Sequence, residues 1–378
     1  MAVVDRGPSG ALRGDNVLAL HPGLAFLGLL APMPIFFAAG GWASAGGPST
    51  SRDVVRRISP VVLVAAIVCG AWGTASIVSI LATGGANTVS RGARIATQPL
   101  WFLAAYVPFV ATYRVFARAA THIRVIIPAA VAFVVLGDWL QYARTFPRQI
   151  GFPGFFVVWG TPWLIGTWWH RRSEDPAFDE RRTGAALTLI GLVACVLLVR
   201  FVGYSPSLID AVPGRRTNST PPGLFTMAAA VAQVGVLMMV ARMLDSVANR
   251  HRNLVKRFSS VAVGIYAWHL TGFALCAAMI ALGLPAPERF STTWWLTRPL
   301  WFVAIITVTF AFADPTRRLV ARIGTKGATN AGPTSIAVLL ATTGTALTGL
   351  YGPRSIPMSL VIVSVTILAV RFLRPQSR

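Results

Sequence analysis

The sequence predicts an all-α integral membrane protein, a polytopic bundle of about eleven transmembrane helices. Hydrophobic residues make up 54% of the 378-residue chain and charged residues only 12%, whereas soluble domains carry roughly 25% charged residues. Apolar runs long enough to cross a bilayer recur from one end of the chain to the other. Most of the chain is therefore expected to form helices packed together in a membrane.

The apolar runs place the predicted spans at approximately 24–44, 59–83, 96–113, 125–141, 152–169, 184–203, 222–241, 259–282, 294–313, 333–350 and 355–373. Residues 1–23 form a polar N-terminal segment that lacks the apolar core of a signal peptide. Residues 24–373 form a single transmembrane domain, of which the last two helices, 333–373, are a peripheral addition. The three cysteines lie inside apolar runs without metal-ligand spacing, so no metal site is expected.

Basic residues gather in short clusters between the apolar runs and set the orientation. The predicted side that holds Arg57, Arg124 and Arg257 carries 22 Lys and Arg, and the opposite side, with Arg216, carries 10. The positive-inside rule then places the first side, and the C-terminus, in the cytoplasm of a multi-pass plasma-membrane protein. The net charge of +22 follows from these clusters, so nucleic acid is not an expected partner.

The first candidate site combines small and basic residues near the start of the chain. Small residues at 40–46 allow another helix backbone to approach, as ordinary membrane packing requires. Arg52, Arg56 and Arg57 follow. They are either the usual cytoplasmic flank of a helix or an anion clamp for phosphates such as those of coenzyme A, because arginine forks suit phosphate oxygens.

Asp138 is the second candidate, near the outer end of its predicted helix. A carboxylate at this depth either faces a polar cavity, where it could act in catalysis, or pairs with an arginine such as Arg144.

The third candidate is the outer loop DAVPGRRTNSTPPG at 210–223, in which Arg216, Asn218 and Ser219 supply hydrogen-bond donors. It could bind a hydroxylated acceptor or simply be a solvated turn.

His269 is the fourth candidate. It lies about three helical turns past the basic loop that ends at Lys256 and Arg257, which places it roughly 15 Å deep. An imidazole there is either catalytic or hydrogen-bonded to a neighbouring helix. Tyr266 lies three residues earlier on a similar face.

Taken in order, these stretches resemble the membrane acyltransferase-3 family, in particular its actinobacterial branch. The resemblance rests on MPIFFAAGGWASA at 33–45, RRISP at 56–60, QPLWFLAAYV at 98–107, GRRTNSTPPGLF at 214–225 and GIYAWHLT at 264–271. It implies transfer of an acyl group from a donor such as acyl-coenzyme A (acyl-CoA), as co-substrate, to a hydroxyl of a sugar, lipid or secondary metabolite. It also implies His269 as a cavity-lining group.

Two departures from the family pattern stand out. The family's first helix carries an arginine followed by a histidine, and Arg13 and His21 are too close together to be that pair. We therefore expect this form to lack the first helix and the true start to lie upstream. In the cytoplasmic loop, Arg57 fits the second position of an Arg-x-x-Arg pattern, whereas Val54 occupies the first.

The same sequence features also fit two other functions. The chain could be a permease or lipid-handling protein without chemistry, or a degenerate acyltransferase without its catalytic helix. Turnover of an acyl donor by the purified protein distinguishes them.

Overall fold

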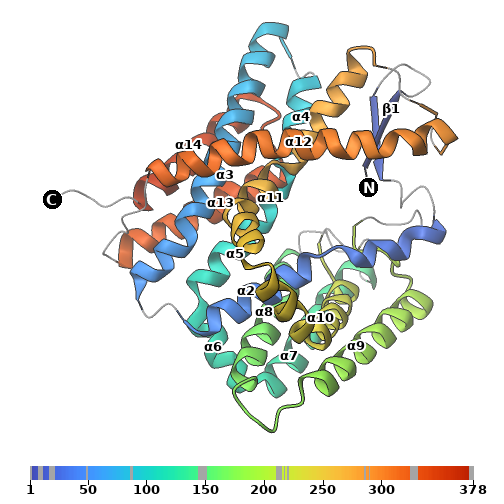
Figure 1. The fold of residues 1–378 in the computed structure, drawn as a ribbon, viewed down its shortest axis with the longest axis vertical. Helices are drawn as coiled ribbons and strands as arrows, with labels where there is room; N and C mark the ends of the chain where they lie inside the picture. The colour runs from blue at the N-terminus through green and yellow to red at the C-terminus, as the bar shows by residue number, and fades with distance from the viewer. Residues whose placement is uncertain are drawn as a thin grey trace. The chain divides into compact units, whose positions relative to one another are not determined.

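The computed structural model describes residues 2–6, 12–16, 22–47, 50–85, 88–143, 151–209, 215–216, 218, 221–284, 287–288, 290–323 and 331–373. Helices dominate this part of the chain (Figure 1), as the composition predicts. Two short strands, β1 (Ala2–Arg6) and β2 (Leu12–Asn16), pair with each other. The chain divides into two compact units.

Unit 1 comprises Met1–Val3, Asp15–Gly47 and Thr112–Arg250. Its helical elements are η1 (Pro22–Leu30), α2 (Met33–Ala45), α6 (Tyr113–Thr121), α7 (Ile123–Ala143), α8 (Phe152–Arg172), α9 (Glu180–Leu197), the π-helical turn η4 (Leu198–Val202) and α10 (Leu224–Arg250). Helix α8 packs against α2, α6, α7 and α10, and α9 packs along α10. Helix α8 therefore forms the centre of this unit.

Glycines bring α2 and α8 into backbone contact. A Cβ on Gly41 would stand 2.0 Å from the carbonyl oxygen of Trp163, and one on Gly166 would stand 2.0 Å from that of Ala38. The Thr167 hydroxyl also donates to the Gly41 carbonyl at 3.2 Å. Only glycine permits this approach, so the small residues predicted to serve helix packing do so here.

Unit 2 comprises Val4–Gly14, Pro48–Ala111 and His251–Arg378. Its helical elements are α3 (Ser51–Thr83), α4 (Thr88–Thr97), η2 (Gln98–Leu100), α5 (Trp101–Ala111), α11 (Arg252–Ala281), α12 (Thr292–Ile323), α13 (Ala331–Leu350) and α14 (Ile356–Leu373). Helix α11 packs against α12, α4 and α3, while the hairpin α13–α14 packs against α3 and α5.

The eleven predicted spans correspond to helical segments, but fewer of them meet the requirements of a membrane span. Within the described residues, seven helices are long and apolar enough to cross a membrane, or eight if Thr88–Ala111 and Tyr113–Thr121 form one span. The apolar parts of α13 and α14 are shorter, Ser335–Leu350 and Ile356–Phe372. Helix α8 has 21 residues, yet its Gly, Pro, Thr and Trp residues make it less apolar than the others. The chain is a multi-pass membrane protein, and the count of eleven is not confirmed.

Candidate functional site

Asp138 lies near the C-terminal end of α7 and joins three segments of unit 1. Its Oδ2 accepts hydrogen bonds from the Tyr204 hydroxyl and from the backbone N–H of Leu224, the latter at 2.9 Å. Leu224 begins α10, so the carboxylate satisfies one of the free N–H groups at that helix start. The predicted partner Arg144 lies outside the described residues.

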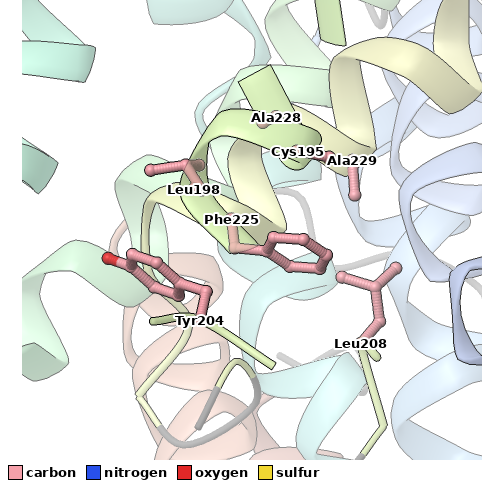
Figure 2. Close-up of a cluster of buried hydrophobic side chains, with 7 residues drawn as sticks. All are labelled: Cys195, Leu198, Tyr204, Leu208, Phe225, Ala228 and Ala229. Carbon is pink, nitrogen blue, oxygen red and sulfur yellow. The ribbon is translucent and has the colours of Figure 1, made fainter. Parts of the chain in front are cut away.

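Tyr204 reaches Asp138 because α9 ends in an unusual turn. The π-helical turn η4 is followed by Gly203 at φ +86°, a left-handed conformation that favours glycine. Tyr204 comes next, with its ring stacked on Phe225 at 6.2 Å between centroids inside a buried apolar cluster (Figure 2). Burial and the neighbouring Asp138 carboxylate raise the pKa of the Tyr204 hydroxyl, so it stays protonated and serves as the donor.

Arg216 is held beside the same tyrosine. Its backbone N–H donates to the Gly203 carbonyl at 3.1 Å, and its carbonyl accepts from the Ser205 N–H at 3.2 Å. Its guanidinium lies 4.4 Å from the ring centroid of Tyr142 and 5.6 Å from that of Tyr204, within cation–π range. The structure thus brings the predicted residues Asp138 and Arg216 together around Tyr204.

Asn218 braces the loop from inside. Its side chain is only 1% exposed, and its Nδ2 donates to the carbonyls of Ser205 at 2.5 Å and Ser207 at 2.8 Å. The backbone carbonyl of Asn218 accepts a hydrogen bond from the Thr226 hydroxyl at 2.5 Å. The buried Oδ1 is an acceptor with no hydrogen-bond partner in the described structure. Ser219, the third residue predicted for this loop, lies outside the described residues.

His269 lies in α11 of unit 2, and its ring orientation follows from one contact. Its Nδ1 is 2.6 Å from the carbonyl oxygen of Tyr266. Because a carbonyl can only accept, Nδ1 carries the proton and Nε2 keeps its lone pair. The Tyr266 hydroxyl donates to the Pro99 carbonyl of η2 at 2.7 Å, which ties this part of α11 to the start of α5. With a lone pair left on Nε2, the His269 ring has a form that can accept a proton as a general base.

The predicted basic residues lie at the start of α3. Thr50 and Asp53 form a capping box there. The Arg56 guanidinium is 3.7 Å from the Asp53 carboxylate, and its side chain is 78% exposed. Arg57 is half-buried, and its positive charge interacts electrostatically with the Tyr106 hydroxyl. Arg52 lies in the first turn of the helix.

A row of aromatic rings in unit 2 leads from Arg57 toward His269. Tyr106 stacks on Phe102 at 5.7 Å, and Phe102 packs against Tyr266 at 5.3 Å. Tyr266 is the residue whose carbonyl holds His269. Sequence reasoning did not single out Tyr106 or Phe102. The available signal was their spacing of four within QPLWFLAAY, which puts both on one face of a helix.

Two groups of candidate residues therefore emerge, each within one unit. Unit 1 gathers Asp138, Arg216 and Asn218 around Tyr204, and unit 2 gathers Arg57 and His269 along the aromatic row. Among the described residues, no group of three or more His, Cys, Asp or Glu side chains could hold a metal ion.

The model of an acyltransferase domain, acyltransferase 3, matches residues 17–318. Neither a curated protein nor a solved structure matches the chain.

Proposed function

Since this chain belongs to the acyltransferase-3 family, we propose that it moves an acyl group, acetyl or similar, from an acyl-CoA-type donor to a hydroxyl of an acceptor. The acceptor is a sugar, a lipid or a secondary metabolite. The observation that carries the proposal is the family match over residues 17–318, which includes both groups of candidate residues.

His269 is the proposed base. The acceptor oxygen attacks the thioester carbonyl while Nε2 of His269 takes the hydroxyl proton. The carbon–sulfur bond then breaks, the thiolate leaves, and the proton passes from the imidazolium to that sulfur. The products are an ester and free coenzyme A. The hydrogen bond from Nδ1 to Tyr266 supports this role because it keeps the lone pair on Nε2 and stabilises the charged ring.

Arg52, Arg56 and Arg57 are the proposed cations for the donor phosphates. They belong to the more basic side of the chain, which the positive-inside rule places in the cytoplasm together with the C-terminus. In a plasma-membrane protein this is the side from which a cytoplasmic acyl donor arrives. Of the two described side chains, Arg57 interacts with Tyr106 in the aromatic row that leads to His269, and Arg56 pairs with Asp53.

The loop around Tyr204 is the proposed binding site for the acyl acceptor, and Arg216, Asn218 and Ser219 are the residues proposed to form hydrogen bonds with it. Asp138 was predicted as a catalytic group. Its Oδ2 already accepts two protein hydrogen bonds, from the Tyr204 hydroxyl and from the Leu224 N–H. We therefore place it as the carboxylate that holds the acceptor loop, with His269 alone as the base.

The test is turnover by purified protein in lipid nanodiscs. Free thiol release from acetyl-CoA is measured with a panel of sugar and lipid hydroxyl acceptors, for the wild type and for His269→Gln. Acceptor-dependent thiol release supports the proposal. Movement of an acceptor across vesicles without acylation indicates a permease instead, and the absence of both activities indicates a degenerate enzyme.

A further inference from the structure

The helical hairpin α13–α14 begins after residue 318, where the acyltransferase match ends. We propose that this hairpin positions His269, by holding in place the segment η2–α5 on which Tyr266 is anchored. The proposal rests on the proposed function where it concerns catalysis, and on geometry alone where it concerns the orientation of the imidazole.

The hairpin is built into unit 2 along a buried face of small residues. Ala341, Thr345 and Thr348 of α13 are at most 1% exposed. Thr348 contacts the Cys69 thiol of α3 at 3.5 Å. The Ser76 hydroxyl of α3 donates to the carbonyl of Pro353, in the turn between α13 and α14, at 2.5 Å. Lipid-exposed appended helices would not need these buried polar contacts.

One position in α13 touches the start of α5. A Cβ added to Gly349 would stand 2.5 Å from the Cβ of Trp101 and 2.8 Å from its Cα. These are atoms fixed to the backbone of α5, so they cannot move aside without moving the helix. Helix α13 also packs directly against η2, the segment that contains Pro99.

From that contact the path to the imidazole is short. The Pro99 carbonyl accepts the Tyr266 hydroxyl at 2.7 Å, and the Phe102 ring lies 5.3 Å from that of Tyr266. The Tyr266 carbonyl is the acceptor for Nδ1 of His269 at 2.6 Å. A shift of η2–α5 therefore moves the groups that orient His269. An error of about 1 Å in a catalytic group can cost roughly 10²-fold in rate.

Small residues at helix contacts usually serve packing alone, and the experiment must separate that role from positioning. Gly349→Ala is compared with Gly344→Ala, a matched change five residues earlier in α13. A Cβ on Gly344 would meet only side-chain atoms of Val365 and Thr366, at 3.4 and 3.5 Å, before reaching any backbone. That distance is ordinary van der Waals contact, so this variant controls for the loss of glycine.

Both changes are made in the full chain, with and without His269→Gln. We expect Gly349→Ala to lower kcat about tenfold or more with little change in the KM for the donor, and Gly344→Ala to leave kcat unchanged. In the His269→Gln background, Gly349→Ala should cause no further loss, since residues that act through one another are not additive. The same fold-loss in both backgrounds would overturn the proposal.

A second readout does not depend on turnover. In protein labelled with ¹⁵N-histidine, the His269 ring resonance is assigned by its disappearance in His269→Gln. Gly349→Ala should shift this resonance, and Gly344→Ala should not. If the wild type acylates nothing, the proposed function fails and this spectrum alone decides the positioning role, which an unshifted resonance would refute. If Gly349→Ala does not fold, Ser76→Ala, which only unties the hairpin from α3, is judged by the same two readouts.

Discussion

At the scale of single residues, His269 carries the clearest chemical prediction. The only described hydrogen bond of its ring is the one from Nδ1 to Tyr266, which stays within α11, so replacing the ring removes a base without breaking a described hydrogen bond between helices. We expect His269→Gln to lower kcat by about 10²–10⁴-fold, the usual contribution of general base catalysis, with a small change in melting temperature. Turnover and thermal unfolding in the same nanodisc preparation check this. A destabilised variant with intact specific activity would return His269 to a structural role.

The two adjacent arginines make a matched pair at the same scale. Arg57 interacts electrostatically with Tyr106, which belongs to the aromatic row that leads to His269. Arg56, by contrast, is exposed and pairs with Asp53. We expect the double change of Arg56 and Arg57 to glutamine to weaken acyl-CoA binding at unchanged protein abundance, with Arg57→Gln responsible for most of the loss. Calorimetric titration with an acyl-CoA analogue measures the change in donor affinity. Poor membrane insertion with normal donor affinity in the surviving protein would leave these residues as topology signals only.

At the scale of elements, the link among α7, the segment that follows η4, and α10 depends on one carboxylate. Tyr204 donates to Asp138 from a buried position that is 2% exposed. Hydrogen bonds to charged groups contribute about 1.5–3 kcal/mol, so Tyr204→Phe should destabilise the protein by this order. The effect should vanish when Asp138 is already alanine, because the partner is gone.

Thermal unfolding of the two single variants and the double variant tests this link. Tyr351→Phe is the control, since Tyr351 is 42% exposed and loses only a hydroxyl at the surface. If Tyr204→Phe is as well tolerated as Tyr351→Phe, the link does not hold the loop.

At the scale of the whole molecule, topology is the property to test. The charge distribution of 22 against 10 predicts that reporter fusions after Arg257 and Arg322 read as cytoplasmic and those near Arg216 and Glu288 as external. Arg216 and Arg257 flank α10, so a common side for both would contradict its assignment as a span. A fusion at Glu174, directly after α8, decides whether that less apolar helix also crosses the membrane; the charges predict a cytoplasmic reading.

The amino-acid pattern alone identifies a multi-pass membrane protein and locates its helical segments. Apolar runs and clustered arginines reflect the solvent around each segment, and that information is local in the chain. His269 and Asp138 could be singled out for the same reason, because a polar side chain in an apolar run is costly wherever it lies, and Arg57 could be singled out by its place in a basic cluster. The resemblance of the chain to the acyltransferase-3 family was confirmed over residues 17–318.

Which groups these residues contact depends on how the helices pack. Asp138 bonds to Tyr204, 66 residues away, and to Leu224, 86 residues away. The sequence pointed only to the nearby Arg144, which lies outside the described residues. The aromatic row between Arg57 and His269, and the contact of Gly349 with Trp101, likewise join segments far apart in the chain. Such pairings depend on how helices pack, and packing is set by the shapes of both surfaces at once. A pattern read along one segment records the apolar face of a helix but not the partner that covers it.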